Sequence, residues 1–171
     1  NSQIPEGLKK IIELFPADAH PMGVLASSLV GLSGFYNQYN DVLKLGPHEK
    51  RKVLTQLMGQ ILTISARFYR KMKGQGPIEP DANLDYASNF LYMLHGKRPD
   101  PAVARALDQL LILHADHEQN CSTSTVRVVG SSQANVFGCI SAGVEALWGP
   151  LHGGANQAVL EMLEEIQRAG G

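Results

Sequence analysis

Apolar residues recur every three or four positions along most of this chain, and this spacing is the feature that most limits how it can fold. Val53, Leu57, Met58, Ile61 and Ile64, for example, would share one face of a helix. No stretch alternates apolar and polar residues as a half-buried strand does. The sequence therefore predicts an all-α fold of about eight helices.

The length of the chain suits a single domain. Its 171 residues are enough to bury a core and lie within the usual range for one domain. The segment 74–80 is rich in glycine and proline, but it is too short to link two domains. We therefore expect residues 1–171 to form one helical domain.

Three segments carry the expected core. Residues 22–32 are almost continuously apolar, which predicts a helix buried on most sides, with Asp18 as its N-terminal cap. Pro101 is suited to a first helical turn, and the residues after it predict an apolar face that leads to His114 and His117. Residues 136–147 are rich in glycine and alanine and can pack closely. We expect the segments 107–120 and 136–147 to lie inside the protein.

Charge and cysteine content bound the possible partners and location. The formal net charge is −1, from 15 Lys and Arg against 16 Asp and Glu, and no basic block is present. This argues against a nucleic-acid or anionic-membrane partner. The first residues lack the apolar core of a signal peptide, and no apolar run approaches the roughly 20 residues of a membrane helix. With only two cysteines, we expect a soluble protein of the reducing cytoplasm.

Two polar clusters interrupt the apolar pattern, and the first lies near residues 114–127. His114 and His117 are three positions apart, so on a helix they would face one ligand. No further histidine or carboxylate follows at ligand spacing, and we therefore expect no metal site. His114 can equally be a core histidine with satisfied hydrogen bonds. Asn120 and its neighbours can simply hydrogen-bond the end of a helix.

The second cluster contains Pro150-Leu-His152-Gly-Gly, where we expect the last helix to begin. A histidine at a helix start is disfavoured as imidazolium, and the neutral ring can donate a hydrogen bond to a developing oxyanion. The same sequence is also an ordinary way to start a helix. Cys121 is a weaker candidate for chemistry, because no base is placed beside it by the sequence.

These clusters resemble motifs of the citrate synthase family, and most closely its bacterial, hexamer-forming type. The matching stretches are Ala19-His20-Pro21-Met22, Leu84-Asp-Tyr86-Ala-Ser-Asn89-Phe90, His114-Ala-Asp-His117-Glu-Gln-Asn120 with the following residues to Arg127, and Leu-Trp-Gly-Pro-Leu-His152-Gly-Gly-Ala-Asn156. The order of the expected helices matches over nearly the whole chain.

The resemblance implies an enzyme that condenses acetyl-CoA with oxaloacetate to citrate and CoA, with acetyl-CoA as a substrate and no cofactor. By this resemblance His152 is the catalytic residue that stabilises the enol of acetyl-CoA, and His117 binds oxaloacetate. His114, Asn120 and Arg127 would support the same pocket. The resemblance also implies self-association as a homodimer or hexamer, for which residues 22–32 and the helix from Val136 are the expected interface elements.

The chain also departs from the family pattern. The family's second catalytic histidine, in a Gly-x-Gly-His-Arg-Val-Tyr-like motif, and its catalytic aspartate have no counterpart in these 171 residues. We therefore expect an internal segment of the large domain that is inactive by itself. A 2-methylcitrate synthase remains an alternative, although Gln119 favours citrate. A non-catalytic helical module for self-association is the alternative from another class.

Overall fold

The structure, a computed structural model, describes residues 2–170 apart from the side chain of Asn156. Eight α-helices and one short 3-10 helix form the regular structure of these residues, and no strand occurs among them. The elements are α1 (Glu6–Leu14), α2 (Pro21–Leu32), η1 (Asn37–Tyr39), α3 (Pro47–Met72), α4 (Tyr86–His95), α5 (Pro101–Leu113), α6 (Cys121–Ser131), α7 (Val136–Trp148) and α8 (Gly154–Arg168). The predicted all-α fold is confirmed.

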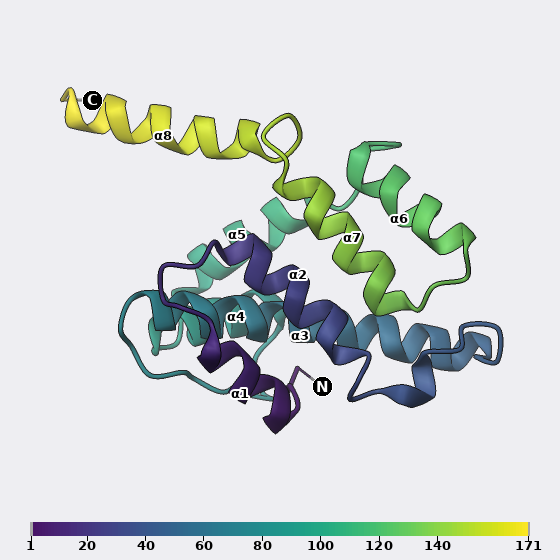
Figure 1. Cartoon of the computed structure of the whole chain (residues 1–171). Coiled ribbons are helices and arrows are strands. Elements are labelled where there is room, and N and C mark those ends of the chain that lie inside the picture. Colours follow the sequence, from purple (N-terminus) through teal and green to yellow (C-terminus); the bar gives the residue numbers. More distant parts are fainter. Residues whose placement is uncertain (1, 171) are drawn as a thin grey trace.

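The helices pack in a continuous series that differs from their order in the chain. α6 lies on α7, α7 on α2, α2 on α3, α3 on α4 and α4 on α5, while α1 contacts α2 and α3 (Figure 1). α8 projects from this body and ends far from it, as Figure 1 shows. The two segments that carry the predicted site, the start of α6 and the turn after α7, therefore belong to neighbouring helices.

α2 lies at the centre of the core. Val24, Leu29 and Leu32 are completely or almost completely buried, together with Ile64 of α3 and Phe137 of α7. The predicted burial of this helix on most sides is confirmed. Its cap is different from the expected one, because His20 precedes Pro21 directly and its Nδ1 accepts a hydrogen bond from the Met22 N–H at 3.3 Å. Asp18 lies in the preceding turn, too far from the helix to cap it.

The predicted burial of segment 107–120 is wrong. Of the residues of α5, Ala104 alone is buried, and the exposed fractions of Leu110, Ile112 and Leu113 are 51%, 67% and 71%. The helical period indicates that one face of α5 is apolar, but it does not indicate what covers that face. In this chain α5 contacts α4 through a small part of its surface and leaves most of its apolar side chains in solvent.

α7 is packed inside on one side, as predicted. Phe137, Cys139, Ser141 and Gly143 are buried, and the Ser141 hydroxyl donates a 2.8 Å hydrogen bond to the carbonyl oxygen of Ala26 in α2. α2 and α7 are thus joined to each other within one chain. The faces that α2 and α7 share form the core, and the expectation that these helices are subunit interface elements stays a prediction for their remaining surface.

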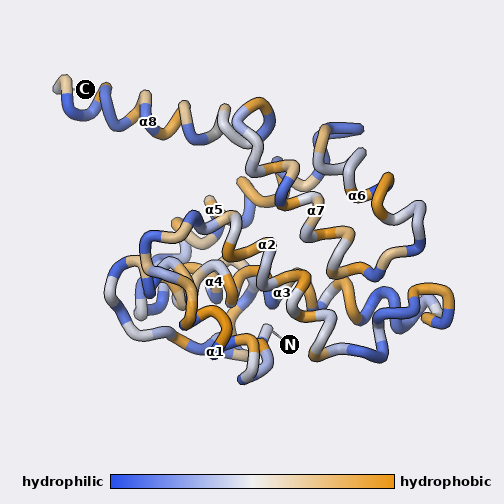
Figure 2. Tube along the Cα trace, in the orientation of Figure 1, coloured by the Kyte–Doolittle hydropathy of each residue, from blue (hydrophilic) through white to orange (hydrophobic). Residues whose placement is uncertain are grey.

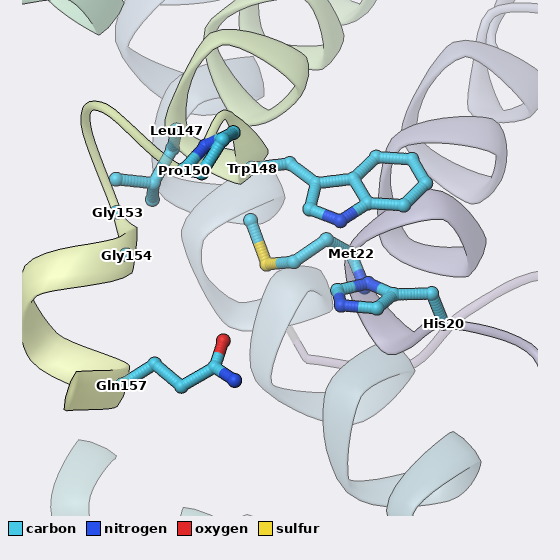
Figure 3. Close-up of a pocket in the computed structure, with 8 residues that line it drawn as sticks. All are labelled: His20, Met22, Leu147, Trp148, Pro150, Gly153, Gly154 and Gln157. Atoms are coloured by element: carbon cyan, nitrogen blue, oxygen red, sulfur yellow. The ribbon is translucent and has the colours of Figure 1, made fainter. Parts of the chain in front are cut away.

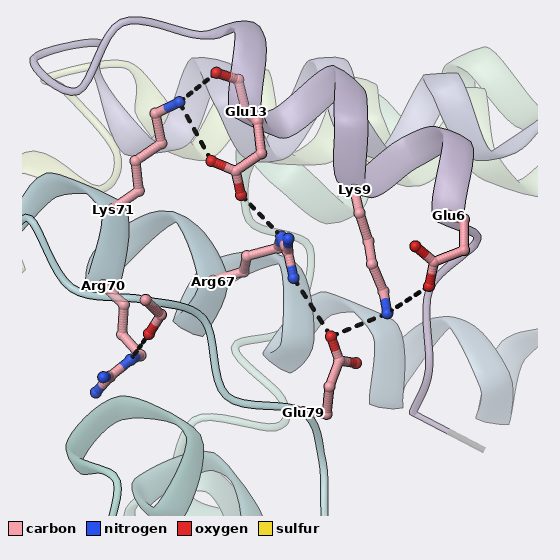
Figure 4. A network of polar contacts seen from close by, with 8 residues as sticks. Glu6, Lys9, Glu13, Arg67, Arg70, Lys71 and Glu79 are labelled. Carbon is pink, nitrogen blue, oxygen red and sulfur yellow. Dashed lines mark hydrogen bonds and ion pairs between the residues drawn. The ribbon is translucent and has the colours of Figure 1, made fainter.

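A network of charged side chains holds α1 against α3 and the segment after it (Figure 4). Arg67 lies between two carboxylates, with its Nε 3.1 Å from Glu13 and its Nη1 3.4 Å from Glu79. Lys9 also contacts Glu79 at 2.9 Å, and hydrogen bonds to Glu6 and Glu79 raise the pKa of its ammonium group. The network fixes the segment around residue 79 to the helices.

The projecting helix α8 is amphipathic. Figure 2 shows hydrophobic and hydrophilic residues alternating along it. Its apolar residues are exposed in the described chain: Val159, Leu160, Met162, Leu163 and Ile166. Between residues 2 and 170, none of the helices combines the length and the apolar character that crossing a membrane requires.

Candidate functional site

A cavity of about 600 Å³ lies where α5, α6 and α7 come together. Its lining consists of His114, His117, Asn120, Ser122, Thr123, Leu147 and His152. Four of the five predicted site residues therefore line one cavity, although they come from two separate parts of the chain, the loop 114–120 and the turn after α7. Arg127 is the exception, because it lies on an exposed part of α6 and is not in the lining. Its supporting role stays a prediction.

His114 and His117 approach each other, but they do not lie on one helix as expected. α5 ends at Leu113, and the chain from there to Asn120 is a turn. The Asp116 carboxylate accepts a 2.9 Å hydrogen bond from the Glu118 N–H, and Glu118 has a left-handed backbone with φ of 57°. Such a side-chain turn competes with helix continuation. The two imidazole centroids are nevertheless 5.6 Å apart, so both rings reach the cavity.

The His114 ring has a defined orientation. Its Nδ1 lies 2.7 Å from the carbonyl oxygen of Leu110, one turn earlier in α5. A carbonyl can only accept, so Nδ1 must carry a proton, and in the neutral ring Nε2 is left as an acceptor. The hydrogen bond anchors His114 to the end of α5, which fits the supporting role expected for it.

The first turn of α6 faces the cavity. Asn120 is its cap, and its side-chain oxygen accepts a 2.9 Å hydrogen bond from the Thr123 N–H. Ser122 and Thr123 follow in the first turn, where backbone N–H groups lack helical partners and the helix dipole is positive. A helix start with free donors attracts anionic groups such as carboxylates. The cavity therefore combines three imidazoles with the positive end of a helix.

We expected His152 to begin the last helix. In the structure it lies in the turn before that helix. α8 starts at Gly154, and the His152 N–H donates to the carbonyl oxygen of Gly149 at 3.0 Å. Its ring meets the start of a different helix, α6. Nε2 lies 3.3 Å from the Ser122 N–H and 2.7 Å from the Ser122 hydroxyl. The His152 ring therefore faces the start of α6 and not the start of α8.

The contact with Ser122 determines which nitrogen of His152 is free to act. A backbone N–H can only donate, so Nε2 must present its lone pair, and the proton of the neutral ring then lies on Nδ1. Nδ1 has no hydrogen-bond partner among the described residues of the chain. In this tautomer Nδ1–H is left to donate, while the contact with α6 orients the ring through Nε2.

A second, smaller cavity of about 430 Å³ lies beside the same turn (Figure 3). His20 and Trp148 are stacked in its lining, with ring centroids 4.6 Å apart and an angle of 21° between the planes. Leu147 belongs to the lining of both cavities. None of the predicted site residues lines this second cavity, so we assign the candidate site to the first.

Other chemistry-bearing groups are dispersed. Within the described part of the chain, no three His, Cys, Asp or Glu side chains are grouped as metal ligands would be. Cys121 is exposed at the start of α6 and does not line the cavity, while Cys139 is buried in α7, which raises the pKa of its thiol.

Ser122 is the main site residue that the sequence reasoning missed, since it was read as helix-end hydrogen bonding alone. Its role depends on a contact with a residue thirty positions away. A partial signal was present, because Asn120 is a favoured cap and places Ser122 in the first turn, where its N–H is free. That signal identifies a donor but does not identify its partner.

Comparison with known proteins gives a consistent result. The family model described as "Citrate synthase, C-terminal domain" matches residues 1–170. Citrate synthase 1 of Mycobacterium tuberculosis is 50% identical over 99% of this chain and 40% of its own length. The chain thus spans about two fifths of the length of this curated relative.

Solved structures agree with the sequence matches. Citrate synthase from Pyrobaculum aerophilum is 33% identical, with a TM-score of 0.87 over 96% of this chain and 42% of its own. A ternary complex of carboxymethyl coenzyme A and oxaloacetate with citrate synthase from Thermoplasma acidophilum is 25% identical, with the same TM-score and coverage. The helical arrangement described above is therefore one found in known enzymes.

Proposed function

Because this chain belongs to the citrate synthase family, we propose that it forms part of an enzyme that condenses acetyl-CoA with oxaloacetate, with water cleaving the thioester, to give citrate and CoA. The observation that carries the proposal is the contact between His152 and Ser122, which holds Nε2 and leaves Nδ1–H as a donor beside His114 and His117. Because the chain covers about 40% of its relatives' length, the activity is proposed for the enzyme that contains this segment.

His152 would act on the thioester. Removing a proton from the methyl group of acetyl-CoA moves negative charge onto the thioester oxygen. A donor that is already oriented stabilises this charge without rearrangement, and losing one such donor typically slows catalysis by about 10²–10³-fold. A neutral imidazole can serve as this donor, as in other enzymes that use histidine as an electrophile. Ser122 would keep the His152 ring in the required tautomer.

His117 would bind oxaloacetate. The substrate carries two carboxylates, and the start of α6 beside His117 offers the positive end of the helix dipole. His114, Asn120 and Arg127 would have supporting roles. The Thermoplasma acidophilum relative, which holds oxaloacetate together with a coenzyme A derivative, supports this choice of substrates.

The base that removes the methyl proton is a separate part of the proposal. None of the residues that line the cavity has a carboxylate. We propose that the base lies outside these 171 residues, in the aspartate motif that the family carries and this sequence lacks. We propose that acetyl-CoA takes part as a substrate and that the enzyme uses no cofactor.

We also propose the wider setting of the enzyme. Residues 1–171 would belong to the large helical domain of a cytoplasmic, bacterial-type citrate synthase. The exposed apolar residues of α5 and α8 support association with further protein surface, which we propose to be a homodimer or hexamer.

The proposal is tested by assaying the complete enzyme that contains this segment. Oxaloacetate is supplied with acetyl-CoA or, in parallel, with propionyl-CoA, and release of the CoA thiol is followed. We expect faster turnover with acetyl-CoA. A preference for propionyl-CoA would instead identify a 2-methylcitrate synthase, and no thiol release with either substrate would support the non-catalytic alternative.

A further inference from the structure

The spacing between α6 and α7 depends on one small residue, Gly143. A Cβ atom at this position would lie 2.7 Å from Cγ2 of Val126 in α6, which is closer than real Cβ atoms come to their neighbours. Val126 cannot readily turn away, because a β-branched side chain in a helix has one strongly preferred rotamer. Gly143 therefore lets the two helices approach more closely than alanine would allow.

The two partners of the His152 contact are attached to these two helices. Ser122 lies one turn before Val126 on α6, so both residues face α7. His152 follows α7 in a tight turn, since the N–H groups of His152 and Gly153 both donate to the carbonyl oxygen of Gly149. The turn is folded onto the end of α7 so closely that a Cβ at Gly153 would collide with the Leu147 carbonyl oxygen. His152 thus moves with α7, and Ser122 moves with α6.

We infer that Gly143 is a positioning residue for His152: by setting the distance between α6 and α7, it places Ser122 where it selects the tautomer of the His152 ring. The inference rests on the proposed function for its catalytic meaning, but the structural part is independent of it. The hydrogen bond from the Ser122 N–H to Nε2 is already long at 3.3 Å. A shift of α6 by a few tenths of an ångström moves it beyond hydrogen-bond distance.

The direct test is NMR of the ¹⁵N-labelled histidine rings in the whole 171-residue chain at mildly alkaline pH, where imidazoles are neutral. The spectrum distinguishes protonated from unprotonated ring nitrogens, and the His152 signals are assigned from their loss in His152→Gln. We expect Nδ1–H in the unmodified chain and a mixture of tautomers in Gly143→Ala. Gly138→Ala is the matched control on the same helix, because a Cβ there would be 3.7 Å from its nearest neighbour.

A compensating change separates positioning from general damage. Val126→Ala removes the methyl group that a Cβ at position 143 would strike, so the double variant Gly143→Ala/Val126→Ala should recover the original tautomer. If Gly143→Ala alone fails to fold, the double variant provides the test in its place. The inference is overturned if folded Gly143→Ala keeps the original His152 signals, or if the double variant does not recover them.

Steady-state kinetics then test whether the tautomer of His152 affects catalysis. In the complete enzyme, we expect Gly143→Ala to lower kcat by about 10-fold with the KM for oxaloacetate little changed, because a misdirected donor acts on the chemical step. Normal turnover in Gly143→Ala with an altered His152 tautomer would refute the catalytic part of the inference. If the proposed function itself is wrong, no citrate forms in any variant, while the NMR result remains valid.

Discussion

The Ser122 hydroxyl lies 2.7 Å from Nε2 of His152, although thirty residues separate the two in the sequence. The contact joins the first turn of α6 to the turn that follows α7. It occupies one ring nitrogen with donors and leaves the other beside a cavity that also contains His114 and His117. A histidine held in this way is suited to donating a hydrogen bond rather than to accepting a proton.

Replacing His117 should weaken oxaloacetate binding more than it slows turnover. A hydrogen bond to a charged group is typically worth about 1.5–3 kcal/mol, so His117→Ala should raise the KM for oxaloacetate by about 10-fold or more. Steady-state kinetics of the complete enzyme measure this. His48→Ala, on an exposed histidine of α3 outside the cavity, is the control. An unchanged KM with a lowered kcat would assign His117 to the chemical step instead.

The cap of α4 should make stability depend on pH. Asp85 accepts hydrogen bonds from the Ser88 N–H at 2.8 Å and the Ser88 hydroxyl at 2.9 Å, and these hold the pKa of its carboxyl below the ordinary value. A lowered folded-state pKa stabilises the protein above the unfolded-state pKa of about 4, and this contribution is lost as the pH falls through the folded-state value.

Two variants check the cap. Asp85→Ala should lower the free energy of unfolding by about 1 kcal/mol at neutral pH. Asp85→Asn retains a hydrogen-bond acceptor but cannot titrate. The difference in free energy of unfolding between this variant and the original chain should therefore be smaller near about pH 3 than at neutral pH. Urea unfolding at the two pH values measures both effects. Asp18→Ala, at the cap expected from the sequence but not used, should be nearly neutral. If the free energies of unfolding of Asp85→Asn and the original chain differ by the same amount at both pH values, the Asp85 carboxylate does not cause the pH dependence.

Local signals predicted most of the fold. Pro47 and Glu49 are typical of a helix start, and at the start of α3 the Glu49 carboxylate accepts a 2.9 Å hydrogen bond from the Gly46 N–H. The nearly continuous apolar stretch of α2 predicted its burial, because such a helix has no polar face to expose. These features depend on residues close together in the sequence, so they could be predicted from the sequence.

Tertiary contacts account for what the sequence did not predict. α6 was not assigned as a helix because its first half is rich in serine and threonine and has no apolar period. The exposure of α5 depends on which other elements pack against it. The spacing of apolar residues along α5 does not indicate those elements. Four cavity residues were identified from their chemistry and the family resemblance, but the role of Ser122 required the packing of α6 on α7.

The exposed apolar face of α5 should drive self-association. We expect the 171-residue chain to sediment as a dimer or larger species at micromolar concentration. Ile112→Lys places a charge in that face and should shift the distribution towards monomer. Leu14→Lys changes an equally apolar residue on α1, 83% exposed, and should have little effect. A monodisperse monomer before any substitution would count against the predicted association.

The 171-residue chain should form no citrate by itself. Its cavity supplies an oxyanion donor but no carboxylate base, and positioned proton transfer typically contributes about 10²–10⁴-fold to the rate. Thiol release from acetyl-CoA in the presence of oxaloacetate measures this, with the complete enzyme as the positive control. Citrate formation would place the base within these residues, and Asp116 and Glu118, next to His117 in the sequence, would then be the first to replace.

The most direct test of the account is the turnover of His152→Ala in the complete enzyme. Removing the donor should lower kcat for citrate formation by at least about 10²-fold, with the circular dichroism spectrum and the KM for oxaloacetate nearly unchanged. Near-normal turnover by this variant would show that His152 does not stabilise the enol, and the role assigned to its contact with Ser122 would be wrong.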